Sequence, residues 1–165
     1  MNTLFIILTL LRLDGAQENH LQQARPYLTS VAAAIDAAAV RSVPRERLIA
    51  IAFEESRFGY RQHLRGSFPI GAAGECGVFQ QLPRFAPLGG DCNKLGRDLG
   101  FAARSAVASV RYVIRRWRVR GGASMDRKIC HYNGGNRCNS SARAYARRHA
   151  RTRARVLRIM RGQER

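Results

Sequence analysis

Residues 43–59 of the chain read VPRERLIAIAFEESRFG, and the rest of the sequence is placed around this stretch. Pro44 suits the first turn of a helix, because proline lacks an amide hydrogen and its φ angle is already helical. Gly59 is typical of the residue that ends a helix. The stretch therefore predicts a helix from about Arg45 to Phe58.

Two neighbouring carboxylates, Glu54 and Glu55, stand near the end of this predicted helix. Apolar residues occur seven, four and three positions before Glu55, which puts this side chain on the apolar stripe and leaves Glu54 on another face. We therefore expect Glu55 to be the buried carboxylate. A buried acid beside a glycine-rich stretch is costly unless it is used, although pairing with one of the many arginines fits this position equally well.

The remaining sequence predicts a mainly α-helical chain with one glycine-rich segment. Residues 59–100 are rich in Gly, Pro and isolated aromatic residues, a composition that favours a binding surface over a core. Apolar spacings of three and four predict further helices at about Leu21–Ala39, Phe101–Arg118, Met125–Tyr132 and Ser141–Met160. Since no strand signal or repeat is present, we expect a mainly α fold.

Size and charge limit the class of protein. The 165 residues suit one domain, and the net charge of +18 is extreme for that length. Such a charge favours a polyanionic partner, which includes nucleic acid, an anionic membrane surface and the bacterial envelope. The excess of arginine fits a bias in base composition equally well. No nucleic-acid-binding module is recognisable, so no specific nucleic acid is expected.

The four cysteines form an even set, Cys76, Cys92, Cys130 and Cys138. None of their spacings is the two-residue gap of zinc ribbons or redox motifs, so neither a metal nor another cofactor is expected. We favour disulfides between sequential cysteines, 76 with 92 and 130 with 138, because each closes a short loop containing glycine. Such bonds indicate an oxidising compartment, while reduced core thiols are the alternative.

The N-terminus carries an apolar run from Leu4 to Leu11 that is broken only by Thr9. We interpret residues 1–20 as a possible signal peptide or N-terminal extension, with Ala16 before a cleavage point, and residues 21–165 as the domain. The run is too short to span a membrane. A mis-assigned start codon and the first turns of a core helix are the alternatives.

Three ordered motifs carry a resemblance to a known family. They are Glu55-Ser56, then Gly77-Val78-Phe79-Gln80-Gln81-Leu82-Pro83, then His131-Tyr132-Asn133-Gly134-Gly135. Together they resemble the catalytic domain of the soluble lytic transglycosylases, in the lysozyme-like superfamily and related to goose-type lysozyme. The resemblance covers about Tyr27 to Met160. The chain departs from the family in a longer spacing between Glu55 and Gln80.

The resemblance implies a lysozyme-like domain that cleaves the glycan strands of peptidoglycan. Glu55 is then the catalytic acid at the β-1,4 bond between N-acetylmuramic acid and N-acetylglucosamine, and the product is a 1,6-anhydro sugar. The implied substrate-binding residues are Ser67, Phe79, Gln80, Tyr132, Asn133 and Tyr145. The implied protein is an exported monomer, periplasmic or extracellular, held to anionic envelope polymers by its arginines.

Other functions fit parts of the sequence. In a muramidase, water attacks the sugar in place of the muramyl hydroxyl, and Asp91 or Asp98 would position that water. A non-catalytic basic protein that binds wall polymer or nucleic acid is a further alternative.

Overall fold

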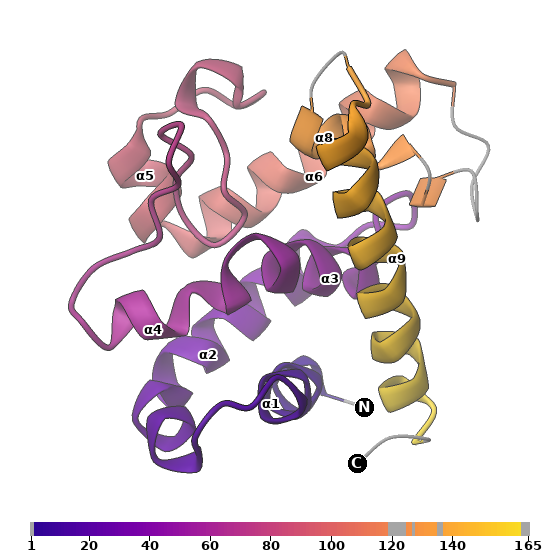
Figure 1. The fold of residues 1–165 in the computed structure, drawn as a ribbon. Helices are drawn as coiled ribbons and strands as arrows, with labels where there is room; N and C mark the ends of the chain where they lie inside the picture. Colours follow the sequence, from indigo (N-terminus) through magenta and orange to yellow (C-terminus); the bar gives the residue numbers. More distant parts are fainter. Residues whose placement is uncertain (1, 119–124, 127, 135–136, 163–165) are drawn as a thin grey trace.

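The computed structural model describes residues 2–118, 125–126, 128–134 and 137–162, and this part of the chain is mainly helical (Figure 1). Its α-helices are α1 (Thr3–Leu13), α2 (Glu18–Ala38), α3 (Arg45–Ser56), α4 (Tyr60–His63), α5 (Cys92–Arg97), α6 (Leu99–Arg116), α8 (Cys130–Gly134) and α9 (Ser140–Met160). Two 3-10 helices, η1 (Arg57–Gly59) and η2 (Pro83–Phe85), accompany them. The described residues contain isolated β-bridges but no strand, which confirms the mainly α class.

Helix α3 is the central element of the structure. It packs against α2, α6 and α9, and Figure 1 shows it running through the middle of the molecule. All seven residues from Arg47 to Phe53 are buried, so this helix has no solvent-facing side over two turns. The prediction that α3 buries only one stripe, which left Glu54 outside the interior, is therefore wrong. The Glu54 side chain is only 6% exposed.

The N-terminal apolar run forms an interior helix in this structure. Ile6, Ile7 and Leu10 on α1 are completely buried in the core that the other helices share. The Thr3 hydroxyl donates a hydrogen bond to Asp36 of α2 at 2.6 Å. These contacts correspond to the alternative of a core helix, while an export signal stays a prediction.

The helix ends differ from the expected positions where the backbone changes its conformation. Helix α3 ends at Ser56, because Arg57 and Phe58 both adopt positive φ angles, 52° and 62°. Helix α2 begins at Glu18 and contains Pro26 within its length. The expected helix at 125–132 is observed in part as α8, which begins at Cys130. None of the helices in the described part of the chain is long and apolar enough to cross a membrane.

Two disulfides join the cysteines in the expected pairs. Cys76 is bonded to Cys92 and Cys130 to Cys138, with Cα atoms 5.4 and 5.5 Å apart. The first bond joins two parts of the glycine-rich segment, the chain at Cys76 and the start of α5, and the second ties α8 to the residues just before α9. Both are compatible with an oxidising compartment.

Gly77 lets the glycine-rich segment pack closely on α5. Its φ angle is +75°, and a Cβ atom there would lie 2.1 Å from the backbone oxygen of Leu95. Any other residue would clash with this fixed backbone atom. The bridges of Cys76 with Ile70 and with Gln81 hold the adjoining chain in place.

We predict that the packing of α1 contributes strongly to stability. Leu10→Ala removes a completely buried side chain and should lower the free energy of unfolding by about 2–5 kcal/mol. Leu13→Ala is the matched control, because Leu13 lies on the same helix and is 48% exposed. Urea denaturation of both variants measures the difference, and equal midpoints would show that α1 does not belong to the core.

Candidate active site

Glu55 lies in the last turn of α3 and is partly buried. Its pKa is raised to about 8, chiefly by burial; the nearby carboxylates of Glu75 and Glu54 also raise it, and Tyr145 and Arg148 partly oppose the change. Glu55 forms no ion pair with any described residue. At neutral pH the carboxyl group therefore keeps its proton and can donate it.

Two tyrosines from the C-terminal part of the chain lie beside Glu55. Tyr145 on α9 is 2% exposed, and its hydroxyl has no hydrogen-bond partner of good geometry. This hydroxyl interacts electrostatically with Glu55, as does Tyr132 on α8. The Tyr132 hydroxyl donates to the backbone oxygen of Phe79 at 3.0 Å, which links α8 to the glycine-rich segment. Burial raises the pKa of both phenols, so both stay protonated.

Glu75 and Gln80 of the glycine-rich segment lie close together around Gly71. A Cβ atom on Gly71 would lie 2.3 Å from Oε2 of Glu75 and 2.7 Å from Oε1 of Gln80. Glu75 accepts a hydrogen bond from the amide of Ala73 at 3.0 Å and forms no ion pair with a described residue. Because its charge acts on Glu55, Glu75 is a second carboxylate at the same site.

Ser56 joins the end of α3 to the second motif. Its hydroxyl makes hydrogen bonds to the backbone oxygens of Val78 (2.8 Å) and Ala52 (3.3 Å). The residue after Glu55 thus holds the glycine-rich segment against the helix that carries the acid. The serine of the Glu-Ser pair therefore has a structural role that is separate from the chemistry of Glu55.

Several predicted site residues meet at Glu55, and others do not. Tyr132 and Tyr145 lie beside it, and Gln80 lies beside Glu75, with its amide donating to the backbone oxygen of Gly77 at 2.9 Å. Phe79 is only 2% exposed and its ring is part of the core, while its contact with substrate stays a prediction. The backbone oxygen of Phe79 contributes to the site by accepting the hydrogen bond from Tyr132.

The other expected residues have different surroundings. Ser67 is exposed just after a turn, where its hydroxyl donates to the backbone oxygen of Gln62 at 3.1 Å. Asp91 and Asp98 cap α5 and α6 by accepting from the amides of Lys94 and Phe101. The Asn133 side chain lies outside the described residues.

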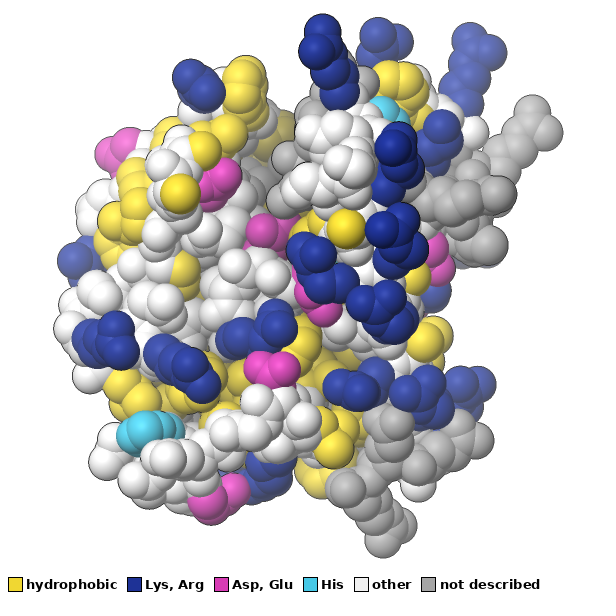
Figure 2. All heavy atoms as spheres, viewed as in Figure 1, with side chains coloured by type: hydrophobic (Ala, Val, Ile, Leu, Met, Phe, Trp, Pro, Cys, Tyr) yellow, Lys and Arg dark blue, Asp and Glu magenta, His cyan; other side chains and the backbone are white. Residues whose placement is uncertain are grey.

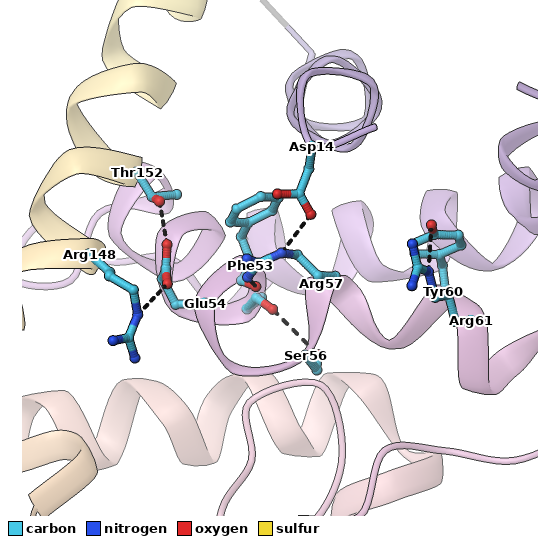
Figure 3. Close-up of polar contacts among 10 residues, drawn as sticks. Asp14, Phe53, Glu54, Ser56, Arg57, Tyr60, Arg61, Arg148 and Thr152 are labelled. Atoms are coloured by element: carbon cyan, nitrogen blue, oxygen red, sulfur yellow. Dashed lines mark hydrogen bonds and ion pairs between the residues drawn. The ribbon is translucent and has the colours of Figure 1, made fainter. Parts of the chain in front are cut away.

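Sequence patterns did not reveal the roles of Glu75, Glu54 and Arg148. Glu75 stands in the glycine-rich segment, where no periodicity indicates which way a side chain points. Glu54 is held by Arg148 at 3.3 Å and by the hydroxyl of Thr152, both from α9 (Figure 3). Two features of the sequence could have indicated these residues. Glu75 is the acid next to Cys76, and Arg148 and Thr152 are one helical turn apart, so that both can reach the same partner.

Charge is unevenly distributed around the site. Figure 2 shows a face that is hollowed between the glycine-rich segment and α9, with acidic side chains in the hollow and arginines gathered along α9. The exposed arginines of α9 are Arg143, Arg147, Arg148, Arg151 and Arg155. The α9 side of the hollow is therefore electrostatically favourable for anionic groups.

One group of potential metal ligands occurs in the described part of the chain, and it consists of Cys130, His131 and Cys138. Its two sulfur atoms form a disulfide, so neither is a thiolate. The His131 ring stacks on Trp117 with ring centres 3.9 Å apart, as expected for a packed ring.

Comparisons of the chain with models of protein families, with curated proteins and with solved structures found no match.

We predict that two substitutions move the pKa of Glu55 in opposite directions. Glu75→Gln removes a negative charge near Glu55 and should lower this pKa, whereas Tyr145→Phe removes a hydroxyl that stabilises the carboxylate and should raise it. The ¹³C NMR titration of the glutamate carboxyl groups measures both shifts. Glu18→Gln, an exposed change on α2, is the control, and shifts of the same sign in the two test variants would contradict this description of the site.

Proposed function

We propose that the chain is a peptidoglycan lytic transglycosylase of the lysozyme-like type, with Glu55 as its catalytic acid. The observation that carries the proposal is a partly buried carboxyl group whose pKa is raised to about 8, beside the Tyr145 hydroxyl and the Gln80 segment. Cleavage of a glycosidic bond needs such a protonated acid. The order of the three motifs supports glycan as the substrate.

In the proposed reaction, Glu55 first donates its proton to the oxygen that links N-acetylmuramic acid to N-acetylglucosamine. The bond between that oxygen and C1 of the muramyl residue breaks, and the muramyl O6 hydroxyl then attacks C1. The ionised Glu55 accepts the hydroxyl proton, so the acid is restored and no water is consumed. Tyr145, which is already adjacent, can donate a hydrogen bond to the transient carboxylate.

The charge and the disulfides support the proposed setting. The net charge of +18 favours binding to anionic envelope polymers, and two disulfides are compatible with export to the periplasm or the extracellular space. We propose that the enzyme meets its substrate there as a monomer.

Glu55→Gln should abolish muropeptide release while the fold is kept, because the amide is nearly isosteric but cannot donate the proton. The assay is digestion of purified peptidoglycan, with circular dichroism as the check on folding. Glu46→Gln, at the other end of α3, is the matched control and should stay active. Wild-type activity should fall as the pH rises through about 8, where Glu55 ionises. Full activity in Glu55→Gln would refute the assignment.

A second candidate, a muramidase, is favoured by one specific observation. Glu75 is a carboxylate near Glu55 without a cationic partner among the described residues, although the chain contains 29 basic residues. In this alternative Glu55 protonates the leaving oxygen, water attacks C1, and Glu75 accepts the proton of that water. Asp91 and Asp98 are less suitable for this role, because each is engaged in capping a helix.

The masses of the products distinguish the two reactions, because anhydro ends and reducing ends differ by one water. A transglycosylase should give anhydro ends, and Glu75→Gln should leave that product unchanged. A muramidase should give reducing ends, and Glu75→Gln should lower its rate by roughly 100-fold or more, the typical loss on removing a general base. Reducing ends from the wild-type enzyme would therefore replace the first candidate by the second.

A further inference from the structure

A separate pocket of about 430 Å³ lies next to the end of α3, on the side of Glu54. Its walls come from the end of α1, the end of α3 and one side of α9, from Arg148 to Arg158. Figure 3 shows the middle of this region, where Arg148 and Thr152 reach from α9 toward Glu54 while Asp14 and Arg57 meet beside Phe53. We call it the arginine pocket, because five of the residues that line it are arginines.

Positive charge exceeds negative charge in this pocket. The arginines are Arg57, Arg148, Arg151, Arg155 and Arg158, and the only acids among the lining residues are Asp14 and Glu54. Asp14 pairs with Arg57 at 2.8 Å and Glu54 with Arg148 at 3.3 Å. Arg151 is exposed and makes no ion pair with a described residue. Arg151 is therefore a guanidinium group of the pocket with which an oxyanion can pair.

Part of the pocket is held rigid before any ligand arrives. The Arg57 guanidinium lies 4.1 Å from the centre of the Phe53 ring and donates to the Phe53 backbone oxygen at 2.6 Å. The ion pair with Asp14 fixes the same group from the other side. An arginine that is already ordered loses little conformational entropy when it binds an anion. The pocket thus differs from a surface of solvated arginines.

The arginine pocket begins beside the candidate active site. Arg148 follows Tyr145 by one turn of α9, about 5 Å along the helix axis, and its charge acts on Glu55. The adjacent residues Glu54 and Glu55 face the pocket and the site respectively. A ligand in the pocket can therefore belong to the same polymer as the sugar at Glu55.

We propose that the arginine pocket binds the carboxylates of the peptide that is attached to the muramyl residue of the glycan strand. This inference rests on the proposed function, because it takes a glycan strand at Glu55 as the starting point. A short peptide linked to the sugar being cleaved is the anionic group nearest to the site. Its carboxylates suit guanidinium groups, which bind such groups through paired hydrogen bonds.

The test measures binding of a free peptide, so that no cleavage is needed. The probe is the tripeptide L-alanyl-γ-D-glutamyl-meso-diaminopimelate, titrated calorimetrically into the Glu55→Gln protein. Arg151→Gln should weaken binding about ten-fold, the loss of one charge-assisted hydrogen bond. Arg147→Gln is the matched control, since Arg147 is also exposed on α9 but does not line the pocket. The same peptide with its carboxylates amidated should not bind.

Equal loss in the two arginine variants would overturn the inference, and so would binding of the amidated peptide with unchanged affinity. A response to Arg151→Gln only with a poly(glycerol phosphate) probe would also overturn it, because that outcome would assign the pocket to a phosphate polymer. Release of muropeptides without peptide binding refutes this inference alone. Peptide binding without release of muropeptides from any wall preparation refutes the proposed function alone.

Discussion

The burial of α3 on all sides is the constraint on which the other features of this structure depend. Adjacent residues of a helix point about 100° apart, so Glu54 and Glu55 leave the same helix in different directions. Glu54 meets Arg148 and Thr152 and is held as an ion pair. Glu55 meets tyrosines and a further carboxylate, and burial without a cationic partner keeps it protonated. One buried helix therefore produces two acids with different chemistry.

The part of the glycine-rich segment around residues 76–79 is held in place by bonds to residues that are distant in the sequence. Ser56 holds the backbone at Val78, and Tyr132 holds the backbone at Phe79. The disulfide at Cys76 and the absence of a side chain at Gly77 attach the same segment to α5. The segment thereby obtains a defined shape with only a small cluster of buried residues, formed by Cys76, Leu95 and Phe101.

The exposed and the buried faces of α9 differ in the charge of their side chains. Outward arginines stay hydrated, so a net charge of +18 is tolerated. On the inner face, His149 is completely buried, and burial together with the charges of Arg47 and Arg153 lowers its pKa to about 3. It is neutral at physiological pH. The helix therefore carries exposed arginines on its outer side and a neutral, buried His149 on its inner side.

The sequence by itself determined the helical class, most helix positions and the disulfide pairs, because periodicity, short loops and helix ends are local properties. The sequence put Glu55 forward as a hypothesis through the Glu-Ser motif. It also brought Gln80, Tyr132 and Tyr145 forward through the order of the motifs. Only the tertiary structure decided that Phe79 belongs to the core, that Glu54 is buried and that Glu75 lies near Glu55. Each of these depends on which other elements cover a residue. A side chain's exposure and its charged neighbours are set by contacts between segments far apart in the chain, such as α3 with α9, and no local pattern records them.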